Sequence, residues 1–525
     1  MLRTFLGRCH RDGVAVAMLG TLSFAVVAFC HAGISRSAEV KPPNIVLILA
    51  DDLGWSDLGC YGNALIDTPH LDRLAQQGLR FTQAYAAAPI CSASRASILT
   101  GKTPARLGFE FVTKSESSFQ DVAAPLRAPP YTLNLPLAET TIAEALATAN
   151  YKTAFFGKWH LNQHYQRYLG WSPTHGPKNQ GFQIAEEDFG MHPYSYWSDR
   201  SERDFLKLDS GEYPADSLTQ RASGFLHAEH SKPFFLMVSH FFVHTPVHTR
   251  IGWLKQDYER RFAEAMENGA TPLAKGKSAA DKWSHYAAMV TTLDHQVGQL
   301  LHAIDTAGLR ESTIVIFTSD NGGHPEYAGN APLRGSKWNL YEGGIRVPMI
   351  ARWPGRIRRG ATSDAIVTGT DLFPTLVALG TGADVVGASE IDGRSIAATW
   401  RENADADARD LADSATKESD RELVWHFPYY HPESQFAKAP AKIGVHDGVT
   451  SQTRPHSVLR AGAWKLIHFY ESGRDELYHL DSDLAEQNDR SESDRDVAVR
   501  MRATLLDRLD QMGARLPVPN PHWQD

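Results

Sequence analysis

The amino-acid sequence predicts an α/β fold, in which a large, mostly parallel central sheet is flanked by helices and followed by a smaller C-terminal antiparallel sheet plus helix subdomain. Short apolar runs without polar alternation, such as 44–50 and 313–318, are typical of strands buried on both faces of a parallel sheet. In the tail, short strand-like segments alternate with turns that contain Gly or Asp, which is typical of antiparallel hairpins. The 525 residues are enough for one large or two medium-sized domains.

The composition is that of an ordinary globular protein, with 42% hydrophobic and 22% charged residues. The formal net charge is −8, and the sequence contains no run of basic residues. Because nucleic acids are bound by basic surfaces, we expect no nucleic-acid partner.

Residues 1–38 are predicted to be a signal peptide and linker. Arginines at positions 3, 8 and 11 precede an apolar run at about 13–29, and Ala32 offers a small residue for cleavage. We therefore expect an exported protein, periplasmic or secreted. If the leader is not cleaved, it would instead anchor the chain to a membrane.

Two of the four cysteines lie in this leader, so the mature chain keeps Cys60 and Cys91. In an exported protein these two could form a disulfide. If Cys91 is chemically modified, Cys60 remains as a free, buried thiol. In either case the fold does not depend on a disulfide framework.

The first predicted strand, 44–50, ends at Asp51 and Asp52. Open α/β sheets bind their ligands at the carboxyl ends of the strands, so these two carboxylates are candidate ligand-binding groups. A solvated turn is the alternative. A helix follows, which Thr68 and Pro69 begin and Gly78 ends, and we expect a loop between this helix and Cys91.

The stretch from Cys91 to Gly101 predicts a helix with Ser92 or Ser94 as its N-cap. The first N–H groups of such a helix are free to bind an anion, and Arg95 adds a permanent, planar positive charge. Cys91 is a candidate nucleophile, although a free cysteine is as often a small buried apolar residue.

A second strand, 151–156, leads to Lys158 and His160. In an extended segment, residues two positions apart face the same side, which makes His160 a candidate acid or base beside a lysine. The region 162–232 is rich in aromatic residues and histidine, and we expect loops and small helices there that form the rim of a pocket.

The third strand, 233–238, is followed by His244, which lies in a loop because Pro246 ends any strand pairing. His240 and His248, in the same stretch, are alternative candidates for the functional histidine. Two helices are predicted next, a charged surface helix at 253–267 and a longer amphipathic helix at 283–307.

The fourth strand, 313–318, ends at a second pair of oxygen-bearing side chains, Asp320 and Asn321. In the glycine-containing loop beyond it, Lys337 is a candidate site residue, whereas Glu342 and Arg346 are expected to brace the loop.

We predict a catalytic α/β domain at 39–380 and a C-terminal subdomain at 381–525. The latter includes a charged, exposed insertion at 401–422, three short strands and a final helix with one apolar face. The last strands are expected at 457–460, 464–470 and 476–480.

Four separate strand ends therefore bring polar side chains to one edge of the predicted sheet. Among them, Asp51, Asp52, Asp320 and Asn321 form an all-oxygen set, which suits Ca²⁺ or Mg²⁺ rather than Zn²⁺.

The segment Cys91–Arg95 reads Cys-Ser-Ala-Ser-Arg and is followed by Leu-Thr-Gly, a pattern that resembles the sulfatase signature. The resemblance spans roughly 43–380 and the tail, and it points to the formylglycine-dependent, arylsulfatase A-like type I sulfatases of the alkaline phosphatase superfamily. Ala93 stands where the signature usually has proline, which bears on the choice of maturation enzyme. Further segments match in the same order: 51–55, 157–161, 244–246 and 320–321.

The resemblance implies a sulfuric ester hydrolase that releases sulfate from a sulfated carbohydrate or an aryl sulfate. A formylglycine-generating maturation enzyme would oxidise Cys91 to formylglycine (3-oxoalanine), whose hydrated aldehyde attacks sulfur. One Ca²⁺ ion, with Mg²⁺ as the alternative, would be held by Asp51, Asp52, the modified Cys91, Asp320 and Asn321.

The resemblance also implies roles for the remaining polar residues. Arg95, Lys158 and Lys337 would neutralise the sulfuryl oxygens. His244, together with Lys337, would bind the ester and assist the leaving alcohol. His160 would deprotonate the second hydroxyl, which expels sulfate and restores the aldehyde.

Two other functions remain as alternatives. One is a phosphodiester or phosphonate monoester hydrolase of the same superfamily, although Asn321 stands where its two-zinc members carry His. The other is a non-catalytic binder of sulfated glycans, which requires that Cys91 is not converted. Several aromatic and histidine residues suit either a sugar-binding rim or core packing: Trp197, Trp425, His426, Tyr429, Tyr430 and His431.

Overall fold

The computed structural model describes residues 41–121, 123–269, 279–328, 330–383, 390–398, 400, 421–430 and 454–523. The predicted signal peptide and most of the predicted insertion at 401–422 lie outside these residues. Residues 42–525 form one compact unit. The domain boundary near residue 380 stays a prediction.

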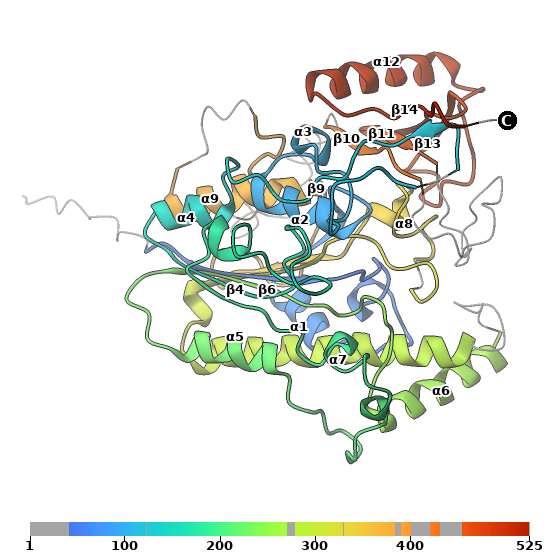
Figure 1. Cartoon of the computed structure of the whole chain (residues 1–525). Coiled ribbons are helices and arrows are strands. Elements are labelled where there is room, and N and C mark those ends of the chain that lie inside the picture. The colour runs from blue at the N-terminus through green and yellow to red at the C-terminus, as the bar shows by residue number, and fades with distance from the viewer. Residues whose placement is uncertain are drawn as a thin grey trace, which may run out of the picture. The chain divides into compact units, whose positions relative to one another are not determined.

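A central sheet of eight strands, in the order β5-β4-β6-β1-β7-β8-β2-β9, forms the middle layer of this unit (Figure 1). All neighbouring strands are parallel except around β8, which is antiparallel to both β7 and β2. The strands are β1 (Asn44–Ala50), β2 (Leu79–Tyr85), β4 (Lys152–Gly157), β5 (Ile184–Glu186), β6 (Phe234–Ser239), β7 (Thr313–Ser319), β8 (Met349–Arg352) and β9 (Ala361–Thr368).

The four strands expected from apolar runs are thus present, as β1, β4, β6 and β7, and they are adjacent at the centre of the sheet. Every residue of β1 and β7 is buried, as expected for strands covered on both faces. In the register, Leu47 pairs with Met237 on one side and with Ile316 on the other.

Helices cover both faces of this sheet, as Figure 1 shows. Alternate β1 residues such as Val46 and Ile48 pack with one group of helices, α1 (Pro69–Gln77), α5 (Ser217–His227), α6 (Gly252–Glu267) and α7 (Ala279–Thr306). The intervening residues, such as Leu47, pack with the other group, α2 (Cys91–Thr100), α4 (Ile142–Thr148) and α9 (Leu372–Thr381).

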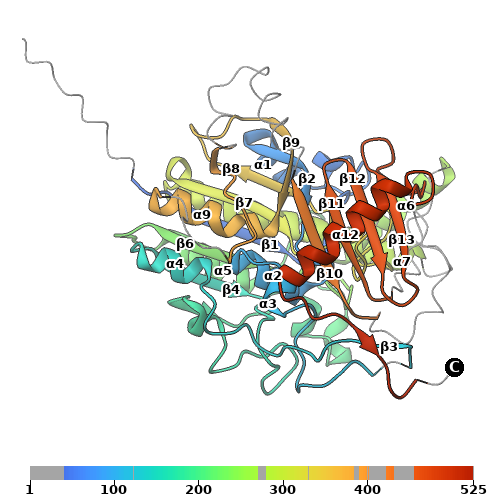
Figure 2. The same ribbon diagram turned by 90° about the horizontal axis from the view of Figure 1, so that it is seen from above.

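A second, antiparallel sheet of four strands lies near the C-terminus, in the order β10-β11-β12-β13 (Figure 2). Its strands are β10 (Glu422–Phe427), β11 (His456–Ala461), β12 (Trp464–Phe469) and β13 (Arg474–His479). Leu459, Leu466 and Leu477 on one face pack against the final helix, α12 (Arg495–Gln511). Val458 and Ile467 on the other face pack against the segment that contains Ile90 and Ala93.

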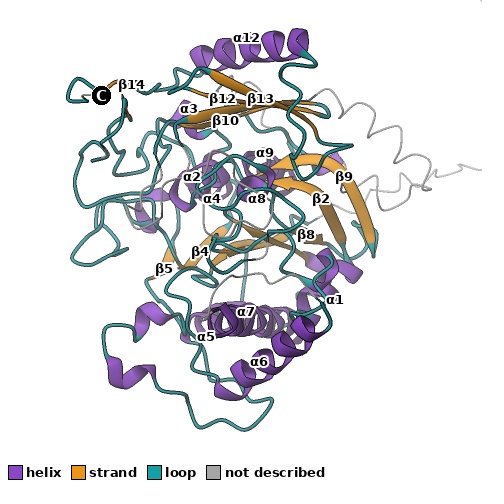
Figure 3. Cartoon of the chain, turned by 90° about the vertical axis from the view of Figure 1, so that its right-hand side faces the viewer, coloured by secondary structure: helices purple, strands orange, loops and turns teal. Residues whose placement is uncertain are grey.

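The remaining elements are short and are joined by loops, which Figure 3 colours teal. They comprise the helices α3 (Pro104–Leu107) and α8 (Glu342–Ile345) and a two-stranded pair of β3 (Leu126–Arg127) and β14 (Val518–Pro519). The 3₁₀ turns are η1 (Gly59–Tyr61), η2 (Pro177–Gln180), η3 (Pro193–Ser195), η4 (Arg200–Arg203), η5 (Arg310–Ser312) and η6 (Gly369–Asp371). None of the helices in the described ranges is long and apolar enough to cross a membrane.

Three expectations about local structure were wrong. The loop expected before Cys91 contains strand β2, and the expected caps Ser92 and Ser94 lie inside α2, whose N-cap is Ile90. Since all ten residues of α2 are buried, the helix begins where packing places it rather than at a capping side chain. His160 has φ +55°, so the segment after β4 is not extended at this residue.

Candidate active site

The ten predicted site residues all lie at the same end of the central sheet, and all are buried. Asp51 and Asp52 follow β1, Lys158 and His160 follow β4, and His244 follows β6. Asp320 and Asn321 follow β7, Cys91 and Arg95 lie in the first turns of α2, and Lys337 lies in the loop before α8.

Backbone hydrogen bonds continue past the strand ends and hold these residues in place. The Asp320 amide donates to the Ala50 carbonyl at 3.1 Å, and the Lys158 amide donates to the Ser239 carbonyl at 2.8 Å. The loop that carries His244 is tied to Asp51, whose amide donates to the Phe242 carbonyl at 2.8 Å. The sheet register therefore fixes the positions of the functional side chains.

Three carboxylates and three cations alternate in the site. Lys158 is paired with Asp51, and Lys337 Nζ lies 2.6 Å from Asp52 Oδ2. Arg95 joins the remaining carboxylates, since its Nε lies 2.8 Å from Asp320 Oδ2 and its Nη2 lies 3.8 Å from Asp51 Oδ1. Each buried charge thus has a neighbour of opposite sign.

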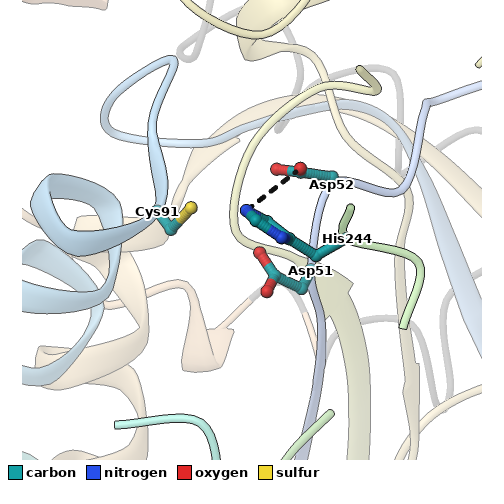
Figure 4. A group of neighbouring side chains, drawn as sticks. All are labelled: Asp51, Asp52, Cys91 and His244. Carbon is teal, nitrogen blue, oxygen red and sulfur yellow. Dashed lines mark ion pairs between the residues drawn. The ribbon is translucent and has the colours of Figure 1, made fainter. Parts of the chain in front are cut away.

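Four of the side chains face one shared space, as Figure 4 shows for Asp51, Asp52, Cys91 and His244. One ligand atom from each of them lies within 4.8 Å of the others. The sequence predicted Asp320 and Asn321 as ligands as well. Asp320 already binds Arg95, and its Oδ1 also accepts a hydrogen bond from the Asp52 amide at 3.2 Å.

Two buried oxygens in the site, Asp51 Oδ1 and Asn321 Oδ1, have no hydrogen-bond partner among the described residues. Asn321 Nδ2 donates to Asp52 Oδ1 at 2.8 Å, which orients the amide of Asn321 relative to that carboxylate. Buried oxygens without a donor are costly unless a cation or water satisfies them, and carboxylate and amide oxygens are the ligands of hard divalent cations. The residues present therefore fit a Ca²⁺ or Mg²⁺ ion.

Burial and neighbouring charges set the protonation states. Burial alone would raise the pKa of Asp52, but the charges of Lys337 and its other neighbours hold it below the ordinary value. Burial lowers the pKa of His160 and His244 well below 6.5, and nearby lysines lower it further. Both histidines are therefore neutral at pH 7 in this structure.

Burial raises the pKa of the Cys91 thiol to about 12. An activated cysteine nucleophile instead needs a lowered pKa, because the thiolate is the reactive form. The encoded side chain is thus poorly suited to attack an ester at neutral pH.

The tautomer of His244 follows from its neighbours. Its Nδ1 lies 2.6 Å from the Thr245 carbonyl, which can only accept, so Nδ1 carries the proton. Its Nε2 is then the free nitrogen and lies 3.7 Å from Asp52 Oδ2, on the side of the shared space.

Several residues that support the site were not predicted from the sequence. Ser239 Oγ donates to the Lys158 carbonyl at 2.9 Å and accepts a hydrogen bond from Arg95. His192 Nε2 donates to the His244 carbonyl at 2.8 Å, and Tyr194 Oη lies 3.1 Å from His244 Nδ1. The concentration of aromatic residues in 162–232 indicated this region but not the individual residues.

The rival histidines lie elsewhere. His240 is buried near Asp216, and His248 stacks on His285 with ring centroids 4.7 Å apart. Four of the proposed rim residues are buried: Trp425 and His426 in β10, and Tyr429 and Tyr430 just after it, so core packing was the correct interpretation for them. Trp197 is partly exposed, and His431 lies outside the described residues. Cys60 and Cys91 are both free, so the disulfide alternative was wrong.

Fold and site together define an α/β protein that places buried oxygen ligands and three cationic side chains at the carboxyl edge of its sheet, a site for an anionic ester. The Sulfatase family model matches residues 43–383. The chain therefore belongs to the sulfatase family, and it is an enzyme that hydrolyses sulfate esters.

Individual relatives agree with this assignment. Human arylsulfatase A is 35% identical over 374 residues, which cover 65% of each chain. A sulfatase of Formosa agariphila is 29% identical over 538 residues, covering 89% of this chain and 88% of that protein. The crystal structure of Ps i-CgsB in complex with k-i-k-neocarrahexaose has a TM-score of 0.64 and 25% identity, and the match covers 92% of this chain and 95% of that one.

Proposed function

We propose that this enzyme releases sulfate from a sulfated carbohydrate, and that it uses a divalent cation and a formylglycine formed from Cys91. The observation that carries the proposal is the buried arrangement of three cations and three carboxylates around Cys91 at the strand ends. The raised pKa of the Cys91 thiol supports conversion to another group, because the thiol itself is a weak nucleophile here.

The cation would be held by Asp51, Asp52, Asp320, Asn321 and the modified side chain of residue 91. When present, the cation supplies charge neutralisation, and the hydrated aldehyde supplies a nucleophilic hydroxyl and a second hydroxyl for the release of sulfate. The protein contributes the remaining steps through groups that it already positions.

Lys158, Lys337 and Arg95 would stabilise the negative charge that builds up on the sulfuryl oxygens in the transition state. These cations are fixed by their carboxylate partners before substrate binds, so little reorganisation is needed during the reaction. Arg95 is additionally fixed by its Nη1 donating to the Lys158 carbonyl at 2.8 Å.

Of Lys337 and His244, Lys337 is the better candidate for protonating the leaving oxygen. Burial opposes protonation of its Nζ, but the neighbouring carboxylate of Asp52 keeps it protonated. Neutral His244 offers a lone pair at Nε2 and would orient the ester. Neutral His160 can accept a proton, as required for a base that acts on the second hydroxyl.

A carbohydrate substrate is supported by the similarity to Ps i-CgsB, whose crystal structure contains an oligosaccharide. An aryl sulfate remains the simpler test substrate, since arylsulfatase A is among the similar proteins. We also propose export to the periplasm or the medium, which N-terminal sequencing of the protein from fractionated native cells would test.

Two measurements test the chemistry. Mass spectrometry of the tryptic peptide Phe81–Arg95 from native protein should show the mass loss that accompanies conversion of thiol to aldehyde. Sulfate release from an aryl sulfate should exceed release of product from a matched phosphodiester, and Cys91→Ala should abolish it. An unmodified Cys91 in native protein would favour the non-catalytic glycan binder, and preference for the phosphodiester would favour the alternative hydrolase.

A further inference from the structure

Beside the site lies a group of residues that the proposed chemistry does not use: Lys114, His164 and Tyr168, which we call the rim patch. We propose that the rim patch binds a second anionic substituent of the substrate, a carboxylate or another sulfate on a sugar, and thereby selects polyanionic saccharides over singly charged sulfate esters. This inference rests on the proposed function and specifies its substrate.

Tyr194 joins the rim patch to the site. Its ring packs edge-on against that of Tyr168, with the centroids 5.7 Å apart, and its Oη lies 3.1 Å from His244 Nδ1. Cys91, Lys158 and Lys337 are close enough to influence the pKa of Tyr168. Nevertheless Tyr168 is 52% exposed, so a ligand in solution can reach it.

Lys114 provides a positive charge without a partner. Its Nζ lies 5.6 Å from the ring centroid of Phe111 and 5.4 Å from that of Tyr131. In the described part of the chain, no carboxylate forms an ion pair with it, although the residue is partly buried. Aromatic rings hold the ammonium in place but do not neutralise it, so it remains available to an anion.

The position of Lys114 next to the site follows from its backbone. The amide of the preceding residue, Thr113, donates to Ser92 Oγ at 3.3 Å, and Ser92 is adjacent to Cys91. The Lys114 carbonyl accepts a hydrogen bond from the His164 amide at 3.2 Å. Lys114 is thus tied both to the helix of the nucleophile and to the loop of Tyr168.

Two imidazole nitrogens face this same region without a partner. His164 Nε2 and His160 Nδ1 are buried and have no hydrogen-bond partner among the described residues, and the two rings lie 5.9 Å apart. The ring of His164 packs edge-on against Tyr168 at 5.0 Å. Buried polar atoms of this kind are satisfied by a ligand or by water.

These features match a sugar better than an apolar alcohol. The exposed ring of Tyr168 can stack on a sugar face, the two imidazole nitrogens can bind hydroxyl groups, and Lys114 can bind an anion. An apolar leaving group would cover the ammonium and the imidazole nitrogens without replacing their contacts with water, which costs binding free energy.

The test compares three saccharides built on one sugar: singly sulfated, doubly sulfated, and singly sulfated with an adjoining uronate. Lys114→Gln should lower kcat/KM about tenfold, mainly through KM, for a doubly charged substrate, and should leave the singly sulfated one unchanged. The doubly charged saccharide for which Lys114→Gln lowers kcat/KM identifies the second anion as sulfate or carboxylate. Lys152→Gln is the matched control, since its Nζ also lies over a ring, that of Phe225 at 5.5 Å, at the opposite end of β4.

An equal effect of Lys114→Gln on all three saccharides would overturn the inference. If the wild type releases sulfate from the aryl sulfate but Lys114→Gln changes nothing, only the rim patch fails. If the wild type releases no sulfate from any ester, the proposed function fails. Calorimetric binding of the same saccharides to Cys91→Ala, with and without Lys114→Gln, gives a readout that does not depend on turnover.

Discussion

At the scale of single residues, Arg95 determines the charge balance of the site. Its guanidinium contacts the carboxylates of Asp320 and Asp51, the Lys158 carbonyl and Ser239 Oγ. A planar fork with five donors can make these contacts at once, whereas an ammonium group cannot. Arg95 therefore holds two carboxylates in position as well as contributing charge.

The variant Arg95→Lys keeps the positive charge but loses the planar guanidinium and its five donors. We expect kcat/KM to fall by about 100-fold, as when one preorganised donor is lost, and the free energy of unfolding to fall by ~1–3 kcal/mol because buried acceptors lose their donors. Sulfate release and denaturant unfolding would measure both. Arg127→Lys, at a partly exposed arginine over Phe119, is the control. Near-wild-type activity of Arg95→Lys would show that charge alone suffices.

At the scale of elements, the last residue of β4 controls the position of Lys158. Gly157 has φ +105°, and a Cβ built there would lie 2.0 Å from the Ser239 carbonyl oxygen of β6. Any side chain would thus force β4 and β6 apart at the point where the strands reach the site.

Gly157→Ala should therefore lower the free energy of unfolding by more than the ~1–3 kcal/mol of a strained backbone alone, and should also reduce sulfate release because Lys158 is displaced. Gly211→Ala is a matched control, since Gly211 also has φ +90° but has open space around its Cβ position. Equal effects of the two substitutions would mean that the contact with Ser239 is unimportant.

Strand β11 contains a group that links stability to pH. Burial lowers the pKa of His456 to about 3, and the neutral ring accepts a hydrogen bond at Nε2 from the Leu340 amide at 3.0 Å. Below pH 6.5 the unfolded chain binds a proton that the folded chain excludes, so stability falls as the pH decreases.

For His456 alone we expect a loss of about 2 kcal/mol in the free energy of unfolding at roughly pH 5. His456→Gln should make the dependence on pH shallower, although His426, whose pKa burial lowers to about 4, will retain part of it. Denaturant unfolding between neutral and mildly acidic pH measures this, with the exposed His302→Gln as control. An unchanged slope in His456→Gln would contradict the assignment.

The elements that the sequence did not reveal lie away from the centre of the large sheet or belong to the small sheet. Strand β9 begins with alternating partly buried and exposed residues and only then becomes buried, so it lacks a continuous apolar run. Strand β8 has only four residues, and β10 begins with an exposed glutamate. Hydrophobic patterns detect strands that are both long and buried along their whole length; β9 and β10 are partly exposed, and β8, although buried, is too short.

At the scale of the whole molecule, a buried ionic cluster connects the two sheets. Lys465 of β12 lies 2.9 Å from Glu342 Oε1 of α8 and 2.8 Å from Glu486 Oε1. Glu342 also pairs with Arg346 at 3.2 Å. The C-terminal sheet is thereby attached to the short helix that follows the loop of Lys337.

Lys465→Met should lower the free energy of unfolding by about 3–5 kcal/mol, because it leaves the buried carboxylate of Glu486 without its cation and Glu342 with Arg346 alone. Adding Glu486→Gln should restore part of this loss, since it removes one of the two charges. Thermal and denaturant unfolding would measure both variants, with Lys178→Met at an exposed lysine as control. If the double variant is no more stable than Lys465→Met, the cluster does not act through charge.

Across the molecule, the sequence predicted the central strands and located the charged residues at their ends, because these follow from buried runs and chain direction. It could not predict the contacts of Ser239 or Tyr194, which depend on how distant segments pack. It could not define the rim patch either, since Lys114 and Tyr168 stand in no recognisable motif and are brought together by loops.

The burial of α2 also has a consequence in time. Cys91 is 1% exposed, and Ile90 and Ala93 beside it are covered by the sheet built from the last part of the chain. That sheet is synthesised long after Cys91, by roughly tens of seconds at about 5–20 residues per second. Any enzyme that alters this side chain therefore has to act before the C-terminal sheet is made and packs over the helix.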